Sequence, residues 1–140
     1  MIWKAKPDIE MLQKLSADTM VEHIGIEFTE AGDDYLIAKM PVDHRTVQPM
    51  RLLHGGANVT LAETLGSVAS TLCLENFGKQ AVVGLEINAN HLKAVKSGFV
   101  FGKVYPVRIG RTIHVWQIDI SDENGQLTCV SRLTVAVIDR

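Results

Sequence analysis

The most apolar stretch of the chain covers residues 52–74 and predicts one long helix. Apolar side chains recur there at helical spacing, as with Leu61, Leu65 and Leu72, and no proline interrupts the run. Only one residue in this stretch carries a full charge, Glu63. Since apolar positions surround Glu63 on most sides, the pattern predicts a helix that the rest of the chain covers on most of its surface.

A run of strands is predicted after this helix. In residues 112–121 apolar and polar side chains alternate, which places Trp116 and Ile118 on one face and Gln117 on the other. The pair Asn124-Gly125 that follows is typical of a β-hairpin turn. The four predicted strands cover residues 81–91, 99–107, 112–121 and 126–138.

The residues before the long helix predict two smaller features. Residues 7–21 have apolar side chains at helical spacing and begin at Pro7, which suits a first helical turn, so they predict a helix. Residues 25–42 predict two short strands around a Gly-Asp-Asp turn.

One helix that needs cover on most sides, followed by consecutive strands, fits an antiparallel sheet wrapped around a long central helix. This α+β arrangement is the layout of the hotdog fold. With 140 residues, the chain is expected to form a single domain over residues 1–140.

The composition narrows the class of protein. The chain is 46% hydrophobic and 21% charged with a formal net charge of -2, so nothing indicates binding to nucleic acid. The N-terminal residues include acids and lack an apolar core, so no secretion signal is predicted. Residues 52–74 are long enough to cross a bilayer, but His54 and Asn58 within them argue against a membrane span. Cys73 and Cys129 are isolated thiols, so we expect a cytoplasmic protein with both thiols buried.

Glu63 is the first candidate for chemistry. Helical spacing places Thr60 one turn before it and Ser67 one turn after it, which forms a narrow polar stripe. Burial of a carboxylate raises its pKa toward the range that suits a general base. The alternative is that Glu63 faces water between two packing surfaces.

The start of the long helix is the second candidate. The first N–H groups of a helix have no partner inside it, so the Gly55 N–H could polarise a carbonyl oxygen as in an oxyanion hole. Gln48, in the preceding loop, is a neutral donor, and His54 could orient that loop through its ring nitrogens. The alternatives are a simple turn at Gly55-Gly56, a solvated Gln48 and a structural His54.

Several other chemistries lack their motifs. The chain has no GxSxG, no phosphate-binding Walker loop and no GxGxxG, so a serine α/β-hydrolase and nucleotide-binding folds are not indicated. The five histidines show no HxxxH or HxH spacing, so no metal site is predicted.

Two segments, QPMRLLHGGANVTLAETLGSVAS (residues 48–70) and VVGLEINANHLKAVKSG (residues 82–98), carry a resemblance to a known family. Together they resemble the hotdog-fold acyl-CoA thioesterases whose catalytic acid is a glutamate on the central helix. The resemblance runs over nearly the whole chain. It is strongest to members that release an aromatic acid from coenzyme A in menaquinone synthesis, and to relatives that remove misloaded aryl groups from a carrier protein.

The resemblance implies roles for the residues singled out above. Glu63 becomes the nucleophile or general base, and the Gly55 N–H becomes the donor to the thioester carbonyl. Gln48 and His54 become positioning groups, and Ser67 becomes the polar partner near the attacking water or the intermediate. The resemblance implies no metal and no other cofactor.

It also implies where coenzyme A binds. Cations near predicted turns suit its phosphates, although an ordinary solvated surface is the alternative for Lys93, Lys96, Arg108 and Arg111. For the acyl group we expect walls that include Met50, Val68 and Val82. The implied binding residues are Val82, Ala89, Asn90, His91, Leu92, Lys93, Pro106, Val107, Arg108, Ile109, Gly110 and Arg111.

The predicted function is therefore hydrolysis of acyl-CoA thioesters, preferentially aromatic ones. The alternatives are a proofreading hydrolase of an acylated carrier protein and a non-catalytic acyl-CoA binding module. A hotdog dehydratase would normally need a histidine paired with an acid at its active helix, which this sequence lacks.

Helix geometry also predicts an assembly. Gly55 and Glu63 would stand roughly 12 Å apart along one helix axis, so one chain cannot bring both to the same carbonyl carbon. We expect a two-fold homodimer with antiparallel helices and shared active sites, and further assembly as a dimer of dimers.

Overall fold

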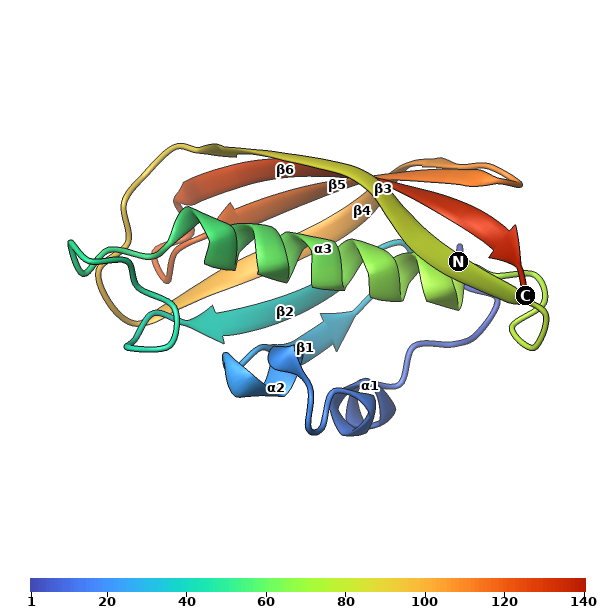
Figure 1. Ribbon diagram of the computed structural model, residues 1–140, viewed down its shortest axis with the longest axis horizontal. Coiled ribbons are helices and arrows are strands. Elements are labelled where there is room, and N and C mark those ends of the chain that lie inside the picture. Colours follow the sequence, from blue (N-terminus) through green and yellow to red (C-terminus); the bar gives the residue numbers. More distant parts are fainter.

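The computed structural model describes all 140 residues and shows one antiparallel sheet curved around a long helix (Figure 1). The six strands follow the order β1-β2-β4-β5-β6-β3, so β1 and β3 are the two edges of the sheet. This α+β hotdog architecture confirms the predicted fold. The elements are α1 (Ile9–Leu15), α2 (Met20–His23), β1 (Glu27–Ala31), β2 (Leu36–Pro41), α3 (Gly55–Leu72), β3 (Gln80–His91), β4 (Phe99–Ile109), β5 (Ile113–Ser121) and β6 (Leu127–Asp139).

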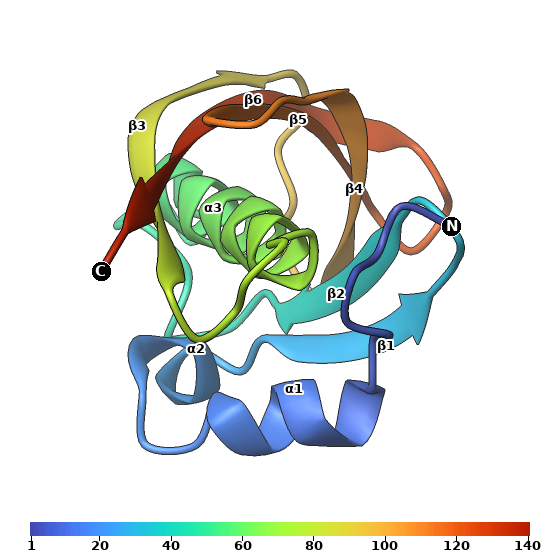
Figure 2. The same ribbon diagram turned by 90° about the vertical axis from the view of Figure 1, so that its right-hand side faces the viewer.

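The long helix α3 forms the centre of the core (Figure 2). Leu61, Leu65 and Ala69 face the sheet and have no exposed surface. The helix approaches the sheet closely at Gly66, where an added Cβ would stand 2.5 Å from a methyl carbon of Leu133 on β6. A side chain at this position would therefore push α3 away from the sheet.

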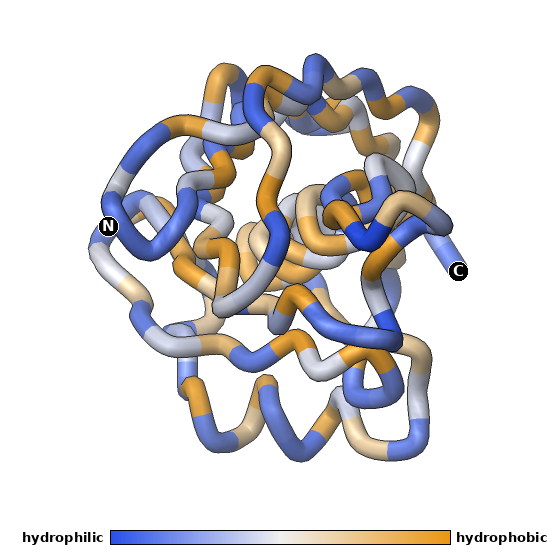
Figure 3. Tube along the Cα trace, turned by 90° about the vertical axis from the view of Figure 1, so that its left-hand side faces the viewer, coloured by the Kyte–Doolittle hydropathy of each residue, from blue (hydrophilic) through white to orange (hydrophobic).

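The four strands predicted after α3 are confirmed, with bounds that shift by at most two residues. Burial alternates most regularly along β5. Hydrophobic and hydrophilic positions also follow one another at short intervals along the Cα trace as a whole (Figure 3). In β5 the even-numbered positions, including Trp116 and Ile118, are buried. The predicted hairpin is also present, with the Gly125 N–H bonded to the Asp122 carbonyl at 3.0 Å and Gly125 at a φ of 77°.

The helix predicted over residues 7–21 is wrong as a single element, because α1 and α2 are separate short helices. The Ser16 hydroxyl donates to the Leu12 carbonyl at the end of α1, and Asp18 has a φ of 59°, which no helix accommodates. Thr19 then caps α2 by accepting a hydrogen bond from the Val21 N–H. Polar residues that favour caps thus interrupt the apolar spacing.

The sheet curves around α3 from β2 to β3 and leaves one side of the helix open between its two edges, so the expected cover on most sides is present but incomplete in the single chain (Figure 2). Glu63, Thr64, Ser67 and Val68 are all partly exposed, on the side of the helix that the sheet leaves open. Apolar spacing does not reveal this gap, because it cannot show where the two edges of a curved sheet end.

The N-terminal segment closes the far end of α3. The backbone N–H groups of Lys4 and Ala5 both donate to the Leu72 carbonyl, and Trp3 stacks on Trp116 with ring centroids 6.5 Å apart. None of the helices combines the length and the apolar character needed to span a membrane.

Candidate active site

The N-terminus of α3 leaves a single backbone donor without a partner. His54 is the N-cap residue: its Nδ1 accepts from the Gly56 N–H at 2.7 Å, and its carbonyl accepts from Ala57 and Asn58. The Gly55 N–H is bonded to no group of the chain. An 18-residue helix therefore presents one free N–H at its positive end, where it can polarise a bound oxygen.

The structural alternative for His54 accounts for its contacts in the chain. Because Nδ1 accepts a hydrogen bond from a backbone N–H, the ring is neutral and its proton is on Nε2. The His54 N–H donates to the Thr46 carbonyl at 2.8 Å, which ties the loop before α3 to the helix start. His54 thus holds the loop and the first turn in a fixed relation, as a positioning group would.

Gln48 lies in this same loop, partly exposed. Its backbone bonds to Arg51 and Leu52 on the far side of the turn, and its side-chain oxygen accepts from the Met50 N–H. The Gln48 Nε2 group has no partner in the chain. The loop thus presents a neutral donor near the start of α3, of the type that the sequence predicts.

Glu63 lies two turns further along α3, with its carboxylate over β3. An added Cβ at Gly84 would stand 2.8 Å from Glu63 Oε1, at a β-bulge between Gly84 and Glu86. No hydrogen bond or ion pair of the chain engages this carboxylate. Glu63 is partly exposed, so the expected burial is wrong for the single chain, but its oxygens are free to accept a proton.

The polar stripe beside Glu63 is present but only part of it can act. The Thr60 hydroxyl donates to the Gly56 carbonyl at 2.9 Å, so its proton is not directed toward Glu63. The Ser67 hydroxyl has no partner in the chain and is partly exposed. Of the two neighbours, Ser67 is therefore the one available to a water or an intermediate.

Sequence and structure comparisons agree on the family. The sequence model of the Thioesterase superfamily matches residues 50–129. The chain is 53% identical to the Escherichia coli 1,4-dihydroxy-2-naphthoyl-CoA hydrolase over 138 residues, covering 99% of this chain and 100% of that one.

The chain belongs to the thioesterase superfamily. It is 51% identical to the proofreading thioesterase EntH of Cronobacter turicensis over 138 residues, covering 99% of each chain. A mutant thioesterase from Pseudomonas aeruginosa has a crystal structure that superposes with a TM-score of 0.98 at 44% identity, covering 100% of each chain. A Haemophilus influenzae thioesterase gives a TM-score of 0.95 at 52% identity, covering 99% of this chain and 96% of that one. The protein is a thioester hydrolase with the hotdog fold, as the sequence resemblance implies.

The predicted coenzyme A residues of this thioesterase fall into two groups at different ends of the sheet. Ile109 pairs with His114, His114 with Val135, and Val135 with Gly84, so Ile109 and Gly84 lie at the same level of the sheet. His91 lies seven residues beyond Gly84 along β3, where it pairs with Cys129. Residues 89–92 and residues 106–111 of one chain are therefore far apart. A single chain does not bring these two groups together.

Two residues expected to bind the substrate differ from the expectation: Lys93 already pairs with another side chain, and Met50 lines no pocket with Val68. Lys93 Nζ lies 2.7 Å from Asp122 Oδ2 and also contacts Gln126, so its charge is already paired. Met50 is 76% exposed, because it projects from the loop before α3, and it lines no pocket with Val68. Lys96, Arg108 and Arg111 form no ion pair.

An apolar groove that the sequence did not predict runs between α1 and the open side of α3. Its volume is about 540 Å³. It is lined by Thr64 and Val68 of α3, by Met11 and Leu15 of α1, and by further residues of these helices and of the segments around them, such as Val21 and Phe77. Val82 does not line it, so only Val68 of the three expected acyl walls does. The paired apolar positions Met11 and Leu15 are the signal in the sequence that could have indicated this groove.

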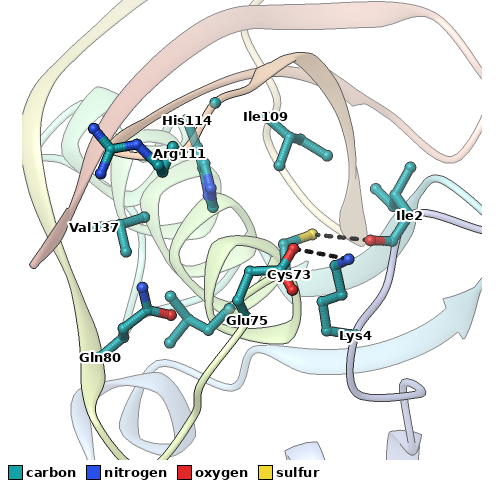
Figure 4. A pocket seen from close by; sticks show the side chains of 11 residues that line it. Ile2, Lys4, Cys73, Glu75, Gln80, Ile109, Arg111, His114 and Val137 are labelled. Atoms are coloured by element: carbon teal, nitrogen blue, oxygen red, sulfur yellow. Dashed lines mark hydrogen bonds and ion pairs between the residues drawn. The ribbon is translucent and has the colours of Figure 1, made fainter. Parts of the chain in front are cut away.

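A second hollow of about 410 Å³ lies just beyond the C-terminal end of α3, beside Cys73 and Arg111 (Figure 4). Burial raises the pKa of the Cys73 thiol to about 11, so the thiol stays protonated and is a poor nucleophile. Lys4 and Glu75 form an ion pair of 2.8 Å at its rim. Cysteine chemistry is therefore not indicated in this thioesterase, although both thiols are buried as predicted.

Proposed function

We propose that this thioesterase hydrolyses aromatic acyl-CoA thioesters to the free acid and coenzyme A. The observation that carries the proposal is that α3 presents one unpaired N–H, at Gly55, and one unpaired carboxylate, at Glu63. The N–H polarises the carbonyl oxygen while the carboxylate attacks the carbonyl carbon or takes a proton from an attacking water. A thioester has weak resonance stabilisation, so these groups suffice without a metal or another cofactor.

These groups account for every bond that forms or breaks in the reaction. In the general-base route a water oxygen bonds to the carbonyl carbon, its proton passes to Glu63, and the C–S bond breaks. The thiolate of coenzyme A then takes up that proton. Ser67 and the Gln48 Nε2 group hold the water and the carbonyl in line, and His54 fixes the loop that carries Gln48.

The site is completed in a two-fold dimer. Gly55 and Glu63 stand roughly 12 Å apart on one continuous helix, too far for one carbonyl group. β3 is a long edge strand with exposed apolar side chains at Val83 and Leu85, a surface that another strand would cover. Antiparallel pairing of two β3 strands would set two α3 helices side by side, with Gly55 of one chain opposite Glu63 of the other.

The same dimer accounts for the coenzyme A residues. In an antiparallel pair, the His91 end of one β3 lies beside the Gln80 end of the partner's β3. Residues 106–111 of the partner lie at that same end of its sheet. One coenzyme A would then contact residues 89–92 of one chain and residues 106–111 of the other. Arg108 and Arg111 are free to bind phosphate there. Assembly as a dimer of dimers remains a prediction.

The groove between α1 and α3 is the place for the acyl group. It is largely apolar, and Thr64 and Val68 on its wall directly follow Glu63 and Ser67 in α3. A flat aromatic acid such as a hydroxynaphthoate or benzoate suits such a slot, consistent with the name of the Escherichia coli relative. We propose that the reaction takes place in the cytoplasm, with menaquinone synthesis as its setting.

A thiol-release screen tests this function. Wild type is assayed on 1,4-dihydroxy-2-naphthoyl-CoA, benzoyl-CoA, and short- and long-chain acyl-CoAs, beside Glu63→Gln and the surface control Glu10→Gln. We expect aryl-CoA to be preferred, with activity lost in Glu63→Gln and retained in Glu10→Gln. If the wild type releases thiol from none of these substrates, the protein would instead be a non-catalytic binding module.

The second candidate is proofreading of an acylated carrier protein, which the 51% identity to EntH favours. Both functions use the same catalytic groups, so they differ only in the carrier of the thioester. A comparison of kcat/KM for one aryl group on coenzyme A and on a carrier protein decides between them. A higher value on the carrier protein would replace the first proposal.

A further inference from the structure

Asn58 is the one buried side chain of the chain with an unpaired polar atom. It lies in the first turn of α3, is 4% exposed, and has no hydrogen-bond partner for Oδ1. Its Nδ2 lies 3.2 Å from Nδ1 of His91, at the end of β3. An unpaired buried acceptor costs free energy that an apolar side chain of this size would avoid. The orientation of this carboxamide therefore serves the contact with His91.

This contact bears on where the His91 ring carries its proton. With the carboxamide nitrogen of Asn58 as the donor, Nδ1 of His91 accepts, and this arrangement requires the tautomer with the ring proton on Nε2. The Nε2 edge faces Gly55: a Cβ added there would stand 2.8 Å from this nitrogen, closer than real side chains come. His91 is exposed, so a ligand can reach the same edge.

In this tautomer two donors lie close together at the start of α3, the unpaired Gly55 N–H and the Nε2–H of His91. Both belong to the same chain, since neither depends on the partner that supplies Glu63. We infer that His91 is a catalytic residue whose Nε2–H binds the thioester carbonyl oxygen beside the Gly55 N–H, and that Asn58 is the positioning residue that sets its tautomer. The inference rests on the proposed thioester hydrolysis.

No proton leaves the imidazole in this role. As the carbonyl carbon is attacked, negative charge moves to the carbonyl oxygen, and the two neutral donors stabilise it. The charge returns as the C–S bond breaks and the thiolate departs. Oriented donors that need not reorganise have their largest effect at this point, so the loss of one lowers kcat more than it raises KM.

The alternative role for His91 is a simple contact with coenzyme A, and steady-state kinetics separates the two. His91→Phe keeps a ring without the donor, and we expect kcat to fall about a hundredfold with KM changed by less than about threefold. His91→Gln places an amide N–H near the Nε2 position and should keep kcat within about tenfold of wild type. His44→Phe, which removes an exposed histidine outside the site, is the control and should match wild type.

The tautomer is measured independently of activity by 15N NMR of the histidine rings, with His91 assigned by its absence in His91→Phe. We expect a ring protonated on Nε2 in wild type and a mixture of tautomers in Asn58→Leu, with kcat of Asn58→Leu lowered about tenfold. Protonation on Nδ1 in wild type, or a KM rise in His91→Phe with kcat unchanged, would overturn the inference.

Glu63→Gln assayed in parallel keeps the two proposals apart. If Glu63→Gln is inactive while His91→Phe retains its kcat, thioester hydrolysis stands and the role of His91 is wrong. If wild type releases no thiol from any thioester, both proposals are wrong.

Discussion

A methyl group at Gly84 is expected to slow the enzyme without unfolding it. The Cβ of Gly84→Ala would stand 2.8 Å from Glu63 Oε1, whereas ordinary contact begins near 3.4 Å, so the carboxylate must retreat by about 0.6 Å. The carboxylate is the end of a flexible side chain and is partly exposed, so this movement costs little stability. A misplacement of about 1 Å in a reacting group can cost about a hundredfold in rate, so we expect kcat to fall about tenfold.

The assay is thiol release from an aryl-CoA at saturating substrate, together with thermal unfolding of the same samples. Gly78→Ala is the matched control, because a Cβ there meets only Asn76 Oδ1, at 3.8 Å. We expect wild-type kcat in Gly78→Ala and an almost unchanged Tm in both variants. A Gly84→Ala enzyme with wild-type kcat would refute the reasoning that the Glu63 carboxylate acts from its place over β3.

Three further predictions concern charge. Glu63→Gln should lower kcat by at least about a hundredfold, or about 2.7 kcal/mol of barrier, with KM little changed; retention of most activity would remove Glu63 from catalysis. Arg111→Ala should raise KM about fivefold with kcat unchanged, and added salt should raise the KM of the wild type in the same way. An unchanged KM in Arg111→Ala would indicate that Arg111 belongs to the solvated surface. Burial lowers the pKa of His114, whose Nδ1 contacts the Ser70 hydroxyl, so unfolding takes up a proton and stability falls as pH drops below about 6.5. Urea unfolding near pH 7.5 and near pH 5.5 should show a smaller difference in His114→Gln than in wild type, and an equal difference would contradict this.

The parts of the fold that depend on local pattern could be predicted from the sequence. Alternation in β5 separates Trp116 from Gln117 correctly, and Asn124-Gly125 marks the hairpin, because both signals involve residues close in the chain. The prediction of one helix over residues 7–21 is wrong because the apolar spacing continues across the caps formed by Ser16 and Thr19.

The site was only partly predictable, for a physical reason. Gly55 and Glu63 lie on one helix, so their spacing follows from the sequence. The contact between Asn58 and His91 joins residues 33 positions apart, and no local pattern indicates it. The sequence cannot show that the charge of Lys93 is already paired, because its partner Asp122 lies in a hairpin 29 residues away.

Complementation between two inactive variants tests most directly that Gly55 and Glu63 of different chains form one site. Gln48→Ala and Glu63→Ala are purified separately, then unfolded and refolded together, and thiol release from an aryl-CoA is measured. Random pairing makes about half the dimers mixed, each with one intact and one doubly altered site, so activity should recover to roughly a quarter of wild type. No recovery above the separately refolded variants, in a mixture shown to contain mixed dimers, would contradict the shared site.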